Sequence, residues 1–376
     1  MLISRMKYIT IIIITVFFSN CTTPSTNNCA TDFDQLSLLE NIGNNIIIPT
    51  YQKLSTEASN LEQLATDFTN NPDQTNLINL RGQLQEIWLT WQTASIFEFG
   101  PAANEELRSH MNNFPVFTTR LESAIDSGSY DLTTEFYSYA RGFPAIEYLI
   151  YGTDTTYSTV IQEFSTSTNS NNRKQMLKDL TALIQQKSNT VYDNWKASGA
   201  NYLNTFTTTE GISNGKPMSD LVNQLNMNYE LIKNYKLGIP ISAKTNYNPL
   251  LPQNVEAYYS RKSLDLAIKG VEASKNVFIG YTNNNDNIGL DDYLQATNAK
   301  KGNEDLHTVI INQFDLALST LNALSPSTLH DAINNNTEAV KSAYAAAQNQ
   351  MVNTKTDMPS ALCISITYVD IVNDGD

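Results

Sequence analysis

The stretch LINLRGQLQEIWLTW, residues 77–91, carries the pattern that decides the fold. Its apolar side chains recur at steps of three and four residues, at Leu77, Leu80, Leu84, Trp88 and Trp91. That spacing is the period of an α-helix that buries one face. We therefore expect this helix to pack its Leu and Trp stripe against other helices.

The same period extends upstream of this helix. Apolar residues from Phe33 to Phe68 follow helical spacing, and Pro49 is expected to kink or split that stretch. Asn71 and Pro72 are expected to cap and open the helix quoted above, and Gly100–Pro101 to end it.

Downstream, helical spacing continues and alternating strand patterns are almost absent. The predicted helices cover 115–126, 133–151, 174–205, 218–237, 254–280, 303–324 and 336–355, and one strand pattern covers 363–372. The stretch 207–217 is rich in Thr, Gly, Ser and Asn and marks the domain boundary. The sequence therefore predicts an all-α protein of two tandem helical bundles, 32–206 and 218–376.

Composition and charge exclude several classes of protein. The chain has 376 residues with 15 Gly, 12 Pro and 3 Cys, far below the contents of collagen-like, low-complexity or disulfide-framework proteins. Its formal net charge is −14. A field of that sign repels phosphate backbones and anionic lipid, so it argues against nucleic-acid partners and against electrostatic docking on a membrane.

The N-terminus has the order of zones found in an export signal. Two basic residues precede the apolar run Tyr8–Phe18, which is too short to span a bilayer, and small or polar residues then lead to Cys21. We predict that 1–20 is a lipoprotein signal peptide, that Cys21 is lipidated, and that 21–31 is a flexible tether. The protein would then be lipid-anchored in the bacterial cell envelope, at the outer membrane or periplasmic face. A secreted protein cut elsewhere is the alternative.

Two cysteines remain after Cys21, and they lie at opposite ends of the mature chain. Domain termini are often close in space, and an exported chain meets oxidising conditions. We therefore predict a disulfide between Cys29 and Cys363. Two unpaired buried thiols are the alternative.

Familiar catalytic motifs are missing from the chain. It has no HExxH, GxSxG or helix-opening GxGxxG, and Gly211–Lys216 fails the phosphate-loop spacing. The three histidines, His110, His307 and His330, are scattered and are interpreted as surface residues. Asn283–Asp292 does not fit a calcium loop and is interpreted as a solvated loop.

Two carboxylates interrupt the apolar helical faces. One further turn along the stripe that ends at Trp91 arrives at Glu98, and a later stripe has Glu147 at its missing step. Burying a carboxylate is costly unless it is paired, hydrogen-bonded or metal-bound, so such positions are candidates for function. We expect both carboxyls to lie in one polar cluster that faces the second bundle. The alternative is that Arg81, Arg141 or Tyr hydroxyls satisfy them as core acids.

The string around Glu147, GFPAIEYLIYG, resembles the GxHxxE motif of the imelysin family, the insulin-cleaving membrane proteases and their iron-regulated relatives. Other stretches resemble the family in the same order, so that the resemblance spans about residues 40 to 376. These stretches are Phe97–Pro101, Val255–Leu264, Gly289–Tyr293 and Asn373–Asp376.

The resemblance implies a pseudo-symmetric, two-domain all-α fold with a cleft between the bundles. The cleft residues that it implies are Glu98, Arg141, Pro144, Glu147, Tyr259, Ser260, Arg261 and Ser263. The sequence departs from the family pattern at Pro144, where the family has His. Proline has no ring nitrogen, so Glu98 and Glu147 remain to bind a hard cation such as iron or calcium, and only weakly.

Three functional hypotheses follow. The first is a non-catalytic, lipid-anchored binding protein linked to iron acquisition, with an iron-uptake or other cell-envelope protein as partner. The second is a metallopeptidase whose ligands lie outside the degenerate motif. The third is a structural or partner-binding lipoprotein in which Glu98 and Glu147 are satisfied core acids.

Overall fold

A computed structural model describes residues 32–152, 156–243, 249–282 and 284–368, and these residues form helices joined by turns. The prediction of an all-α fold is confirmed. The first half contains α1 (Gln35–Asn41), η1 (Ile42–Ile47), α2 (Ile48–Asn70), α3 (Gln74–Ala94), η2 (Ser95–Phe97), α4 (Pro101–Asn104), α5 (Leu107–Met111), α6 (Thr118–Ser127), η3 (Glu135–Ala140), α7 (Gly142–Tyr151), α8 (Tyr157–Ser165), α9 (Ser170–Trp195) and α10 (Tyr202–Thr208). The second half contains α11 (Pro217–Leu231), η4 (Ile232–Gly238), η5 (Pro252–Asn254), α12 (Ser263–Phe278), α13 (Leu290–Thr297), α14 (Leu306–Asn322), α15 (Leu329–Asn335), α16 (Thr337–Met351), η6 (Val352–Asp357) and α17 (Met358–Leu362).

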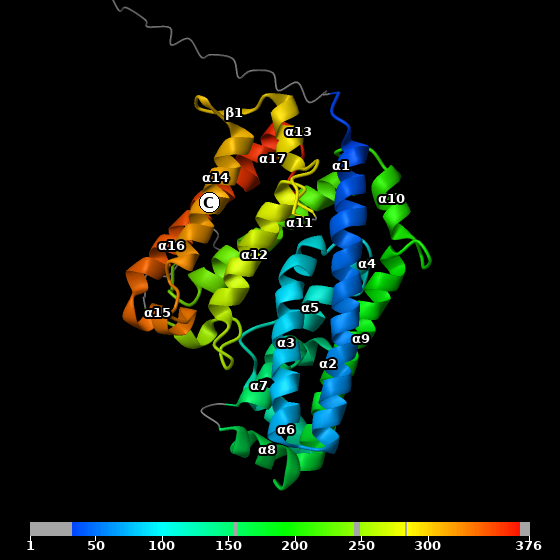
Figure 1. Ribbon diagram of the computed structural model, residues 1–376, viewed down its shortest axis with the longest axis vertical. Helices are drawn as coiled ribbons and strands as arrows, with labels where there is room; N and C mark the ends of the chain where they lie inside the picture. The colour runs from blue at the N-terminus through cyan, green and yellow to red at the C-terminus, as the bar shows by residue number, and fades with distance from the viewer. Residues whose placement is uncertain (1–31, 153–155, 244–248, 283, 369–376) are drawn as a thin grey trace, which may run out of the picture.

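The helices gather in two groups along the chain (Figure 1). In the first group α2 packs against both α3 and α9, and α7 packs against α9. In the second group α14 packs against α12 and α16. A short antiparallel pair, β1 (Lys300–Lys301) and β2 (Glu304–Asp305), precedes α14, with Lys300 opposite Asp305.

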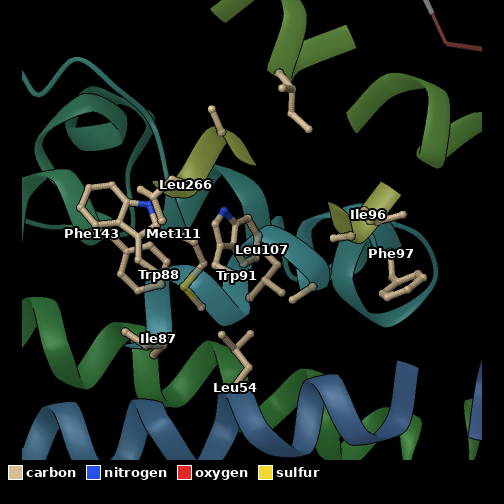
Figure 2. Close-up of a cluster of buried hydrophobic side chains, with 14 of the residues drawn as sticks. Leu54, Ile87, Trp88, Trp91, Ile96, Phe97, Leu107, Met111, Phe143 and Leu266 are labelled. Atoms are coloured by element: carbon tan, nitrogen blue, oxygen red, sulfur yellow. The ribbon is translucent and has the colours of Figure 1, made fainter. Parts of the chain in front are cut away.

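The two groups share one hydrophobic core. Helix α12 of the second group packs against α3, the helix of the Leu and Trp stripe. Figure 2 shows Leu266 of α12 in the same cluster of buried side chains as Trp88 and Phe143 of the first group. The Trp88 and Phe143 ring centroids are 5.6 Å apart, and those of Trp91 and Phe143 are 6.3 Å apart. Aromatic burial of this kind, worth several kcal/mol for each ring, ties the motif helix α7 to α3.

Three π-helical turns explain how the long helices accommodate proline. Pro49, Pro240 and Pro359 each stand two residues after such a turn, namely η1, η4 and η6. Proline lacks a backbone N–H and its ring crowds the carbonyl of the preceding turn, and the wider π turn relieves both constraints. The expected kink at Pro49 is therefore a change of hydrogen-bond register at the junction of η1 and α2.

Several local predictions are corrected by the structure. Asp73, rather than Asn71, caps α3, because its carboxylate accepts the N–H of Asn76 at 2.9 Å. The predicted helix 133–151 is broken at Arg141, whose backbone is extended, and Gly142 follows with φ of +75°. A Cβ at Gly142 would lie 2.3 Å from the Met111 carbonyl oxygen, so this turn requires glycine.

The predicted strand 363–372 is not a strand in its described part, 363–368. Its backbone instead binds the side chain of Asn223 on α11, which donates to the Ser365 carbonyl at 3.0 Å and accepts from Thr367 N at 2.7 Å. An amide side chain thus supplies the hydrogen bonds that a neighbouring strand would supply.

Two residues interpreted as solvated are buried. His110 is 3% exposed because α5 packs against α9 and α7, and its Nδ1 lies 2.9 Å from the Glu106 carbonyl oxygen. Asp291 is 9% exposed because α13 already begins at Leu290, within the predicted loop 283–292.

The predicted signal peptide 1–20, Cys21, the tether 21–31, Cys29 and the terminal residues 369–376 lie outside the described residues. Cys363 is disulfide-bonded, and its predicted pairing with Cys29 stays a prediction. Among the described residues, no helix combines the length and the apolar content that a bilayer crossing needs. The boundaries of the two predicted domains and their pseudo-symmetry also stay predictions.

Candidate functional site

The motif carboxylate Glu147 joins the two halves of the molecule. It lies on α7 and is 2% exposed. Its Oε1 accepts the backbone N–H of Ser260 at 2.8 Å and also the Ser260 hydroxyl. Ser260 lies in a turn between η5 and α12, where Ala257 and Arg261 both have left-handed φ angles. This turn directs two donors of one residue toward the same oxygen.

Burial raises the pKa of Glu147 from its ordinary value of 4.5 to about 7. The hydrogen bonds from Ser260 and Tyr259 oppose that rise because they favour the charged form, whereas the nearby Glu256 carboxylate adds to it. The balance leaves a carboxyl that takes up a proton close to neutral pH.

Glu256 belongs to the second half and is held mainly by donors of the first. Its Oε1 accepts from Asn112 Nδ2 at 2.7 Å, Trp88 Nε1 at 3.1 Å and Gln92 Nε2 at 3.3 Å. Its Oε2 lies 2.7 Å from Lys236 Nζ, in a buried ion pair. Charge-assisted hydrogen bonds to a buried carboxylate are stronger than neutral ones, so this network fixes the relative position of the halves.

Aromatic side chains of both halves meet beside Glu147 and Ser260 in the chain. The rings of Tyr148 and Tyr259 meet edge to face at 5.3 Å, and those of Tyr258 and Tyr259 at 5.0 Å. Arg261 lies 4.9 Å above the Tyr258 ring. Burial, helped by Glu147, raises the pKa of Tyr259 to about 12, so its hydroxyl keeps its proton.

The other predicted site residues have local contacts. Arg141 is almost fully buried and donates to the carbonyls of Leu132, Thr134 and Ser109 and to the Ser109 hydroxyl. Pro144 is the third residue of α7, where no intrahelical donor is needed, so it costs the helix no hydrogen bond. Ser263 is the first residue of α12.

Glu98 does not join Glu147. Its Oε1 accepts the backbone N–H of Arg108 at 2.9 Å, and its buried Oε2 has no hydrogen-bond partner among the described residues. Burial raises the pKa of Glu98, and Arg108 opposes that rise. Helix α3 ends at Ala94 and η2 follows, so the stripe that ends at Trp91 does not continue to Glu98 with helical geometry. The Arg81 guanidinium donates to the Ile150 carbonyl rather than to Glu98 or Glu147.

The metal site that the resemblance implies does not fit these residues. Glu98 and Glu147 share no contact, and one oxygen of each already accepts protein donors. Across residues 32–152, 156–243, 249–282 and 284–368, no group of three His, Cys, Asp or Glu side chains could hold a metal ion. The donor set therefore gives no basis for a metal-assisted step at Glu147.

A cavity of about 180 Å³ opens beside the Glu256 network. The first half lines it with residues of α3, η2, α5 and η3, and the second half with residues of α11 and η4. Gln92, Asn112 and Lys236 both line the cavity and hold Glu256. None of the predicted cleft residues is among the residues that line this cavity. Arg108 and Lys236, the two basic residues of the cavity wall, were not identified from the sequence as site residues.

Comparisons with known proteins agree with this architecture. The imelysin family model matches residues 47–358. One similar solved structure is described as that of an iron-regulated protein A precursor from Parabacteroides distasonis ATCC 8503. Its sequence is 18% identical to this chain, and the two structures superpose with a TM-score of 0.71. The match covers 89% of this chain and 96% of that chain. An imelysin-like protein from Psychrobacter arcticum 273-4 is 15% identical with a TM-score of 0.67, covering 90% and 99%. No curated protein shows significant sequence similarity to this chain.

Proposed function

This chain belongs to the imelysin family, and we propose that it is an exported, lipid-anchored binding protein of the bacterial cell envelope that serves iron acquisition without cleaving peptides. The membrane partner in this proposal is the lipid on Cys21, and the protein partner is an iron-uptake or other cell-envelope component.

The contact between Glu147 and Ser260 carries the non-catalytic part of the proposal. A metallopeptidase needs its motif residues to hold a metal and to leave one coordination position open for water. In this chain the motif carboxylate is buried and accepts two donors from the opposite half. Pro144 stands where the family has His, so the imidazole ligand at this position is lost. These features support a structural role for Glu147.

The export and iron parts of the proposal have other support. Residues 1–21 have the order of zones of a lipoprotein signal, which supports export. The similar structure from Parabacteroides distasonis is described as that of an iron-regulated protein precursor, which supports the link to iron.

Partner binding is a second candidate function, and a surface feature favours it. Phe117 and Phe136 are 46% and 61% exposed, and the Arg120 guanidinium lies 4.5 Å and 4.1 Å above their rings. These residues line a groove on α6 and η3. Arginine and large aromatic side chains contribute most of the energy of many protein interfaces.

A peptidase assay and an abundance measurement test the main proposal. The purified chain is incubated with unfolded casein, with and without zinc, beside Glu147→Gln and the surface control Glu338→Gln. We expect no cleavage by any of the three, and in the host we expect the abundance of the protein to rise when iron is withheld. Chelator-sensitive cleavage that Glu147→Gln abolishes and Glu338→Gln retains would refute the non-catalytic part. An abundance that does not change with the iron supply would refute the part of the proposal that concerns iron acquisition.

A further inference from the structure

The cavity between the halves is lined both by hydrogen-bond donors and by apolar side chains. Arg108, Tyr139, Asn228 and Tyr235 contribute the donors. Trp91, Phe114, Leu231 and Ile232 contribute apolar surface. The π turn η4 presents Ile232, Tyr235 and Lys236 to the cavity, and such turns frequently occur at functional sites.

The Arg108 guanidinium is the cation with the least compensation in this cavity. In the part of the chain that the structure describes, no carboxylate oxygen lies within 4.0 Å of it. Its Nη2 donates to the Ser95 carbonyl at 2.7 Å, its Nη1 reaches only the Met227 sulfur at 3.8 Å, and its buried Nε has no hydrogen-bond partner among the described residues. Glu98 accepts from the Arg108 backbone rather than from the guanidinium.

Lys236 adds no free charge because it is paired with Glu256 at 2.7 Å. The amides of Gln92, Asn112 and Asn113 already donate to protein acceptors, which leaves the side chains of Asn228, Tyr139 and Tyr235 as neutral donors. Asn228 is 5% exposed and lines the cavity, and among the described residues no side-chain hydrogen bond satisfies its amide. Burial raises the pKa of Tyr235, so its hydroxyl keeps its proton and can donate. The cavity thus offers one cation and several neutral donors within an acidic protein of net charge −14.

We propose that this cavity binds a small monocarboxylate with a flat apolar body, whose carboxylate pairs with Arg108 while its body lies against Trp91, Phe114 and Ile232. A guanidinium presents parallel N–H donors that match the two oxygens of a carboxylate. One cation without an ion pair within 4.0 Å, whose charge acts on Glu98 only at longer range, suits one negative charge better than the nearly two charges of phosphate at neutral pH, which would also meet the Glu256 carboxylate. The volume of about 180 Å³ is below that of pockets for drug-sized ligands, roughly 300–1,000 Å³, so the ligand is small. This inference holds whether or not the chain serves iron acquisition.

Benzoate and its neutral isostere benzamide are the probes that test the charge requirement. Binding to the full mature chain is followed by calorimetry and by tryptophan fluorescence, to which Trp91 in the cavity wall contributes beside Trp88 and Trp195. We expect saturable binding of benzoate, with benzamide, acetate and inorganic phosphate each at least about tenfold weaker. Equal affinity for benzoate and benzamide, tighter binding of phosphate, or no saturable binding of benzoate would overturn the proposal.

Three variants locate the site. Arg108→Gln should lower benzoate affinity at least about tenfold and remove the preference over benzamide. Leu231 lines the cavity and is not a hydrogen-bond partner of Arg108, so Leu231→Trp should fill the cavity and abolish binding. Lys53→Gln, at an exposed position of α2 away from the cavity, is the control for loss of one positive charge and should bind as the wild type does. Circular dichroism and thermal unfolding verify that each variant is folded. A folded Leu231→Trp protein that still binds benzoate normally would refute the assignment, even if Arg108→Gln does not fold.

Discussion

Replacing Glu147 by Gln is expected to remove a pH dependence from the stability of the protein. Burial raises the pKa of Glu147 from 4.5 to about 7, so the folded state holds a proton that the unfolded state releases. The stabilisation from this proton is complete below about pH 4.5 and is lost as the pH rises through about 7. Each tenfold difference in proton affinity corresponds to about 1.4 kcal/mol, so the whole effect is about 3 kcal/mol.

In the Glu147→Gln variant the side-chain carbonyl oxygen can still accept both donors of Ser260, and the amide carries no charge to be desolvated. At about pH 5 the variant and the wild type should therefore unfold with similar free energies. At about pH 8 the variant should be the more stable protein by up to about 3 kcal/mol. Urea unfolding, followed by tryptophan fluorescence across this pH range, measures the difference.

Two comparisons make this test specific. Burial and the neighbouring Asp292 and Asp286 also raise the pKa of Asp291 to about 7, but that contribution cancels when Glu147→Gln is compared with the wild type. Glu338, whose side chain is 83% exposed, serves as the control for loss of a negative charge, through Glu338→Gln. If Glu147→Gln and the wild type show parallel stability curves between about pH 5 and pH 8, the burial argument is wrong.

Two further predictions concern the cysteines. Cys21→Ser should convert a membrane-associated protein into a soluble exported one, because the acidic surface offers no other attachment, and fractionation of the host would detect unchanged membrane association if the anchor lies elsewhere. Thiol titration of the denatured, unreduced protein should find Cys29 and Cys363 without free thiols, whereas two reactive thiols would reject the predicted bridge.

Local spacing predicted the helices well because it reports on short-range geometry. The Leu and Trp stripe of α3 is buried as expected, and Glu147 lies inward because it stands about one helical turn after Phe143. The same argument failed for Glu98, because it extended a helical period past Ala94 into a different turn. Hydrophobic period alone does not report where a helix changes its hydrogen-bond pattern.

The cavity could not be predicted from local spacing. Arg108 and Lys236 come from α5 and η4, which are far apart in sequence, and each lies in a segment whose pattern is ordinary. Their roles depend on which carboxylates the fold brings near them. Glu256 pairs with Lys236, and no carboxylate within the described ranges pairs with Arg108. Tertiary packing decides such pairings, so only the assembled halves reveal which cation is available.

The two carboxylates that join the halves differ in one respect that determines how the interface responds to protons. Glu256 has a cation, Lys236, at 2.7 Å, whereas Glu147 is held by the hydroxyl and N–H of Ser260. A buried carboxylate without a cation is costly to ionise, and Glu256 makes that cost larger. Proton release from Glu147 should therefore cost the folded state stability through desolvation, even though the Ser260 donors favour the charged carboxylate. Because Gln92 and Lys236 serve both Glu256 and the cavity wall, substitutions there would disturb the interface and the cavity together. Arg108 has no contact with Glu256 among the described residues, so it can separate ligand binding from the joining of the halves.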